Sequence, residues 1–93
     1  MYNILVCDDE KDIVAALKIY LSGSEYHVLE TYDGQSALNI LEKEDVQLVL
    51  LDIMMPGMDG IETLTRLRRT SNVPVILLTA KSEDTDKKEL GIV

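Results

Sequence analysis

The chain has 93 residues, of which 46% are hydrophobic, a length and composition that fit one small domain spanning residues 1–93. Its 17 acidic residues outnumber the 9 basic ones and give a formal charge of −8. A surface of this sign repels nucleic acid and anionic membranes, so we expect no direct DNA contact and no membrane association by this segment.

Short apolar runs alternate with segments of helical periodicity. The runs that predict strands are 4–7, 28–32, 48–51 and 73–78. Apolar spacing predicts three helices, which begin near Asp8, Asp33 and Ile61. Residues Ser82 to Leu90 are expected to form a short, polar fourth helix that stops at Gly91.

Strands separated by helical segments indicate right-handed crossovers and therefore a parallel sheet. The uninterrupted run Leu48–Leu51 suits a central strand that is covered on both faces. Polar His27 and Glu30 interrupt the second run, which favours an edge position for that strand. The sequence therefore predicts an open α/β sheet.

Polar residues follow three of the predicted strands at the point where each strand ends. Asp8 and Asp9 come after the first, Asp52 after the third and Thr79 after the fourth. Ligands of open parallel sheets bind beyond the carboxyl ends of the strands, so we expect these side chains to share one crevice. Alone, Asp8 and Asp9 could merely cap a helix and Asp52 could merely begin a turn, but the set of three acids favours a site.

Three clustered carboxylates repel one another, and a hard divalent cation such as Mg²⁺ relieves that repulsion. A carboxylate can also attack phosphorus to form an acyl phosphate, whose charge a metal and a nearby hydroxyl stabilise. We therefore predict a Mg²⁺ site at Asp8, Asp9 and Asp52, with Asp52 as the nucleophile and Thr79 as the hydroxyl.

Three stretches of the chain resemble the receiver domain of two-component response regulators. They are ILVCDDE at 4–10, LLDIMMPGMDG at 50–60 and PVILLTA at 74–80, in the family's order and spacing. The resemblance covers essentially the whole chain. It implies a flavodoxin-like, doubly wound fold with an open parallel sheet in the strand order 2-1-3-4.

The resemblance also implies a role for each site residue. Asp52 would accept the phosphoryl group from the phosphohistidine of a histidine kinase, and Thr79 would sense it. Asp9 and Asp52 would ligate Mg²⁺ through their side chains and Met54 through its backbone carbonyl, while Asp8 would hold the metal's waters. Such a domain acts as a switch for a downstream, DNA-binding output that regulates transcription, and is not a turnover enzyme.

The family pattern continues with a fifth helix and a fifth strand, which begins with a Lys-Pro pair whose lysine contacts the phosphoryl group. This sequence stops at Val93, before either element. Lys81 follows strand four directly and is not expected to replace that lysine. We therefore expect a receiver truncated before the fifth strand, with impaired phosphorylation and an intact Mg²⁺ pocket.

Without a fifth strand, the fourth would lie at an edge of the sheet, although Val75–Leu78 carries no charge to block pairing. Exposed apolar edges invite association with another chain. We therefore expect a homodimer or a segment-swapped oligomer that uses strand four and the tail Leu90–Val93.

Two other functions stay open. An aspartate-nucleophile phosphatase would also use Asp52 and Mg²⁺, but those enzymes commonly carry an acid two residues later, where this chain has Met54. A degenerate receiver would serve only as an interaction module, which the missing lysine favours.

The single cysteine, Cys7, is expected to be a buried small hydrophobe. Met1–Asn3 lacks the basic start of a signal peptide, and with one cysteine this indicates a reducing, cytoplasmic setting.

Overall fold

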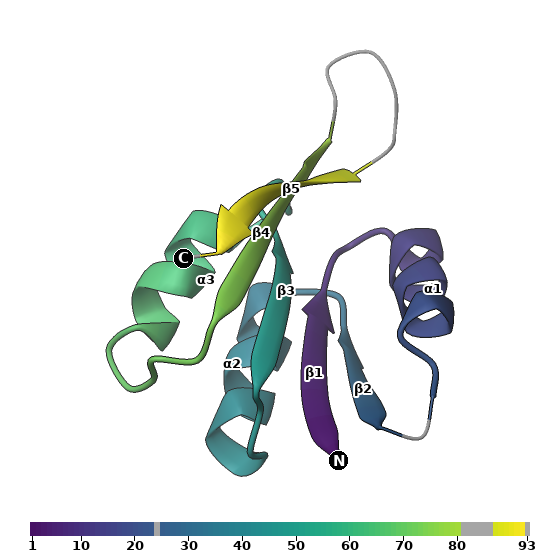
Figure 1. Ribbon diagram of the computed structural model, residues 1–93. Helices are drawn as coiled ribbons and strands as arrows, with labels where there is room; N and C mark the ends of the chain where they lie inside the picture. The colour runs from purple at the N-terminus through teal and green to yellow at the C-terminus, as the bar shows by residue number, and fades with distance from the viewer. Residues whose placement is uncertain (24, 81–86, 93) are drawn as a thin grey trace.

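The computed structural model describes residues 1–23, 25–80 and 87–92 (Figure 1). Five strands form one sheet in the order β2-β1-β3-β4-β5. The strands are β1 (Tyr2–Cys7), β2 (Tyr26–Thr31), β3 (Leu48–Asp52), β4 (Val75–Ala80) and β5 (Lys87–Ile92). Three helices connect the first four strands: α1 (Lys11–Tyr20), α2 (Gly34–Lys43) and α3 (Gly60–Leu67).

The first four strands are parallel, as the alternation of strands and helices predicts. β1 pairs with β2 and β3, and β3 pairs in turn with β4, so the expected order 2-1-3-4 is confirmed. The apolar run of β3 lies between two neighbours, and the polar-interrupted β2 lies at an edge. This topology directs the carboxyl ends of β1, β3 and β4 toward the same border of the sheet.

β5 contradicts two expectations from the sequence. Lys87–Leu90, predicted as the end of a helix, is extended, and β5 pairs antiparallel with β4. The edge of β4 is therefore covered by the chain's own tail, and the expectation that β4 is exposed is wrong. The rest of the predicted fourth helix, 82–86, lies outside the described residues.

Residues Lys87–Ile92 form a strand and not a helix because of the hydrogen bonds that the edge of β4 can make. The edge of β4 presents a row of backbone N–H and C=O groups that require partners, and an extended segment supplies them. Lys87–Ile92 has only Leu90 and Ile92 as large apolar residues, too few for the apolar stripe that holds a helix against a sheet. Tertiary pairing therefore overrides the local helical preference.

The helices cover the sheet unequally: α2 and α3 lie on one face, and α1 lies on the other beside β1 and β2 (Figure 1). Alternate residues of each strand point to opposite faces. Beneath α2 and α3, the buried cluster contains Leu5, Cys7, Ala37, Val49, Leu51, Met55, Leu67, Val73, Val75 and Leu77. Beneath α1, it contains Ile4, Val6, Val14, Leu50 and Leu78. Within the described ranges, no helix is long and apolar enough to cross a membrane.

Candidate metal centre

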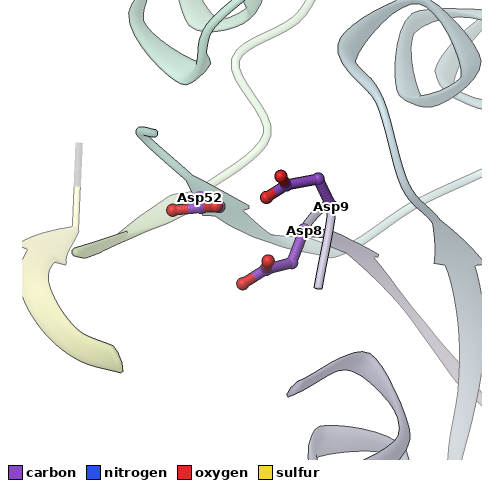
Figure 2. A group of neighbouring side chains, drawn as sticks. All are labelled: Asp8, Asp9 and Asp52. Carbon is purple, nitrogen blue, oxygen red and sulfur yellow. The ribbon is translucent and has the colours of Figure 1, made fainter. Parts of the chain in front are cut away.

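Three carboxylates gather at the carboxyl ends of β1 and β3 (Figure 2). One ligand oxygen from each of Asp8, Asp9 and Asp52 lies within 4.8 Å of the other two. The side chains of Asp8 and Asp52 are fully buried, whereas Asp9 is exposed. The grouping predicted from the strand ends is therefore present, with two acids in the protein interior and the third facing solvent.

Backbone amides and a neighbouring strand fix the two buried acids. The Asp52 Oδ1 accepts a hydrogen bond from the Met54 N–H at 3.2 Å. The Asp8 Oδ1 accepts one from the Glu10 N–H at 2.9 Å, and the Asp8 N–H donates to the Thr31 carbonyl at 3.2 Å. Both carboxylates are thus held in place by local main chain.

The donor set matches the preference of a hard divalent cation. Carboxylate and carbonyl oxygens are the ligands that Mg²⁺ takes, and it usually keeps several waters. No sulfur or imidazole belongs to the cluster of Asp8, Asp9 and Asp52, which argues against a soft metal. Burying two like charges side by side is costly unless a counter-charge offsets them, and a cation between the acids would do so.

The loop after Asp52 carries the predicted carbonyl ligand. The side chain of Met54 is 67% exposed, whereas Met55 is buried in the cluster beneath α2 and α3. The loop closes where the Gly60 N–H donates to the Ile53 carbonyl at 2.9 Å. The backbone of Met54 therefore lies in a closed loop next to Asp52.

Thr79 lies at the carboxyl end of β4, one residue beyond Leu78, which is the register partner of Asp52. Its side chain is half-buried. The hydroxyl that the sequence assigns to the site is thus on the neighbouring strand at the same border of the sheet. Lys81 lies outside the described residues.

Two residues near the site were not singled out from the sequence. Thr31 is buried, and its Oγ1 donates to the Val6 carbonyl at 2.8 Å, which ties β2 to β1 just before Asp8. Gly60, assigned only to a loop, is the first residue of α3 and lies against the main chain of Asp52. An Asp-Gly pair before a helical apolar pattern was the available signal for Gly60.

Cys7 is fully buried beneath the site, as predicted. Its Sγ lies 3.8 Å from the Sδ of Met55. Burial raises the pKa of the Cys7 thiol from 9.0 to about 11, and the nearby acids Asp33, Asp8 and Asp52 act in the same direction. The thiol therefore stays protonated and serves as packing.

Comparison with known proteins identifies the family. The response regulator receiver domain profile matches residues 4–91. The chain belongs to the response regulator receiver domain family. Among curated relatives, the transcriptional regulatory protein YrkP of Bacillus subtilis is 47% identical over 88 residues, which make up 95% of this chain and 38% of YrkP. The chain spans little more than a third of the length of the curated relatives that it matches.

Solved receivers share the fold. The response regulator TrrA of Thermotoga maritima, in a complex with Mg²⁺ and BeF, matches with a TM-score of 0.81 and 38% identity over 88% of this chain and 72% of that one. TrrA in complex with the histidine kinase ThkA matches with a TM-score of 0.80 and 37% identity over 92% of this chain and 75% of that one.

Proposed function

We propose that this receiver accepts a phosphoryl group on Asp52, in a reaction that requires Mg²⁺, and so switches a downstream output. The observation that carries the proposal is the meeting of Asp8, Asp9 and Asp52, whose ligand oxygens lie within 4.8 Å of one another at the carboxyl border of a parallel sheet. Residues 1–93 would act as one receiver unit in this switch.

The proposed reaction is a transfer between a phosphohistidine and a carboxylate. An oxygen of Asp52 forms a bond to phosphorus while the P–N bond of the donor breaks, and the departing imidazole nitrogen keeps the electron pair. Bound Mg²⁺ would supply positive charge to the transferring group. The side chains of Asp9 and Asp52 and the carbonyl of Met54 would hold the metal, and Asp8 would orient its waters.

The remaining residues of the site would act on the product. The Thr79 hydroxyl, on the strand next to Asp52, would donate a hydrogen bond to a phosphoryl oxygen. The Met54 N–H donates a hydrogen bond to the Oδ1 of the buried Asp52 side chain and so helps to hold this carboxylate in place. Position 54, where aspartate-nucleophile phosphatases commonly carry a general acid, is Met in this chain. The proposed role is therefore that of an acceptor and not of a turnover enzyme.

The proposed partners follow from the relatives. A histidine kinase would donate the phosphoryl group, in keeping with the complex of ThkA with TrrA. The output would be a DNA-binding segment that regulates transcription, in keeping with the name of YrkP. This chain spans 38% of YrkP, so the rest of that relative has room for such a segment. A reducing, cytoplasmic setting is also part of the proposal, because the chain's single cysteine, Cys7, has no second cysteine with which to form a disulfide.

Self-association through β4 also remains a proposal, in a revised form. Because β5 occupies the edge of β4, another copy reaches that edge only when β5 leaves it. A segment swap, in which β5 of one copy pairs with β4 of another, would preserve the same hydrogen bonds.

The test is labelling by a small phosphodonor. The protein is incubated with acetyl phosphate and Mg²⁺, beside an Asp52→Asn variant whose fold is checked by circular dichroism. The expected result is a mass increase of one phosphoryl group that hydroxylamine removes and that the variant never acquires. Omission of Mg²⁺ should reduce labelling by at least about tenfold, because the metal offsets charge on the transferring group.

Other outcomes point elsewhere. If Mg²⁺ binds but no label forms, the acceptor role is wrong and an interaction module is favoured. If the protein releases phosphate over many turnovers, a phosphatase is favoured. If Asp52→Asn is labelled as well as the parent, Asp52 is not the acceptor.

A further inference from the structure

A backbone hydrogen bond closes the loop that follows Asp52. The Gly60 N–H donates to the Ile53 carbonyl at 2.9 Å, and between these residues runs the loop that contains Met54. The Met54 N–H in turn donates to the Asp52 Oδ1 at 3.2 Å. The position of Gly60 thus sets the geometry of the segment that links the Asp52 carboxylate to the Met54 backbone.

Gly60 also approaches Asp52 more closely than any other amino acid could. A Cβ built on Gly60 would lie 2.7 Å from the Cα of Ile53 and 2.9 Å from the carbonyl carbon of Asp52, and closer still to the Asp52 carbonyl oxygen. Ordinary contacts between carbon atoms are about 3.5–4.0 Å. The neighbours are backbone atoms at the end of a central strand, so they cannot rotate away as a side chain would.

Helix α3 cannot easily move back to make room. Its N-cap, Asp59, accepts the Glu62 N–H at 2.8 Å, and the Thr63 Oγ1 donates to the Asp59 carbonyl at 2.8 Å. Thr63 is itself buried against Gly34 of α2, where an added Cβ would meet the Thr63 hydroxyl. The start of α3 is therefore held between α2 and the end of β3.

We propose that Gly60 is a positioning residue for the metal centre. The absence of a side chain at this position lets α3 begin against the main chain of Asp52, which places the Asp52 carboxylate and the Met54 carbonyl together. Mg²⁺ demands near-ideal octahedral geometry at about 2.0–2.1 Å, so a shift of the order of 1 Å in this turn removes a ligand. The inference rests on the proposed function, because it assigns Gly60 to the same Mg²⁺ site.

The test compares three glycine-to-alanine variants of the whole chain. Gly60→Ala carries the change, and Gly23→Ala is a control, because a Cβ on Gly23 meets nothing within 4 Å. Gly34→Ala is a second control. Its added Cβ would also be crowded, but by the Thr63 side chain and not by the main chain of Asp52. Mg²⁺ affinity is measured by calorimetry, and urea unfolding gives the folded fraction of each variant.

Gly60→Ala should weaken Mg²⁺ binding to the folded protein by about tenfold or more, the range seen when partners that orient metal ligands are lost. Gly23→Ala should bind as the parent does. Gly34→Ala should lose stability but weaken Mg²⁺ binding to the folded protein much less than Gly60→Ala does, because its added Cβ meets the Thr63 side chain and not the main chain of Asp52. The inference is overturned if Gly60→Ala binds Mg²⁺ as tightly as the parent, or if Gly34→Ala weakens binding equally.

A second measurement keeps the test decisive if Gly60→Ala does not fold. The chain has five glycines, so selective ¹⁵N-glycine labelling gives a simple amide spectrum. Titration of the unaltered protein with Mg²⁺ should shift the Gly60 signal and leave the Gly23 signal in place. A Gly60 signal that stays fixed at saturating Mg²⁺ overturns the positioning role. If the unaltered protein binds no Mg²⁺, the proposed function fails together with this inference, which is a different result.

Discussion

Burial of the Cys7 thiol gives the protein a stability that depends on pH. Burial raises the pKa of this thiol from 9.0 to about 11. Between these values the unfolded chain loses the proton and the folded chain keeps it, so the free energy of unfolding falls as pH rises. The loss from this group should reach about 2–3 kcal/mol by pH 11 and be absent below pH 8.

Urea unfolding at several pH values from 7 to 11 measures this effect, with Cys7→Ala as the matched variant. Alanine leaves a cavity and lowers stability at every pH, but it removes the thiol, so its curve should decline less steeply above pH 9. Equal slopes for the two proteins would show that the Cys7 thiol does not couple to folding. Effects of pH that are common to the two proteins cancel in the difference between their curves.

Some residues of the site can be predicted from the sequence, because the order of strands and helices alone brings them together. Others cannot, because their roles depend on contacts between segments far apart in the chain. Asp8, Asp9 and Asp52 were predicted as a group because parallel strands with regular crossovers bring their carboxyl ends to one border. Thr31 and Gly60 were not, because their roles depend on atoms 25 residues away across strands or on the close approach of a helix to a strand end. Such contacts depend on packing distances that periodicity does not encode.

Helices α2 and α3 pack closely at the start of α2, where Gly34 lies. We expect that a larger residue at this position does not fit. A Cβ on Gly34 would meet the Thr63 hydroxyl and lie 3.1 Å from the Met58 Sδ. We predict that Gly34→Ala costs about 1–2 kcal/mol through overpacking. In a Thr63→Ala background the same change should be neutral or slightly stabilising, because alanine is the better helix former.

A double-mutant cycle by urea unfolding measures this coupling. The expected interaction energy between positions 34 and 63 is about 1–2 kcal/mol, as found for residues in contact. Gly23→Ala, in open space, should show no coupling with Thr63→Ala. If the costs of Gly34→Ala and Thr63→Ala simply add, the two helices have room to separate and the contact is not restrictive.

Among the elements, three helices and four parallel strands were predicted from apolar periodicity, with boundaries displaced by a few residues. The exception is instructive, because Lys87–Ile92 has no strong pattern of its own. Its residues have some helical preference, but the neighbouring edge of β4 offers a full row of hydrogen-bonding groups. The apolar β4 does have a pairing partner, as its sequence predicts, but that partner is the chain's own tail and not another molecule.

At the scale of the whole molecule, β5 covers the edge of the sheet that β4 would otherwise present to other chains. β5 pairs with β4 through the register Ile76 with Ile92 to Ala80 with Lys87. Removal of residues 87–93 would leave the edge of β4 without this partner, in a strand whose run 75–78 has no charge. We predict that the shortened chain self-associates more strongly than the intact one, because apolar edges pair with other edges.

Light scattering coupled to size-exclusion chromatography, from about 10 to 500 μM, measures this difference. The intact chain should shift toward a dimer only at the upper end of the range, since a segment swap merely exchanges equivalent hydrogen bonds and the net charge of −8 opposes contact. The shortened chain should associate at the lower end, more so at high salt, which screens that repulsion.

An added charge supplies the control for this last prediction. Ile76→Lys in the shortened chain places an ammonium group within β4, and charged residues on an edge strand oppose pairing. This variant should return toward the monomer while it keeps its far-ultraviolet circular dichroism. If the shortened chain stays monomeric over the whole concentration range, the edge of β4 does not mediate self-association. The pairing of β4 with β5 then serves only to stabilise the fold. If Ile76→Lys associates as strongly as its parent, the contact lies elsewhere on the surface.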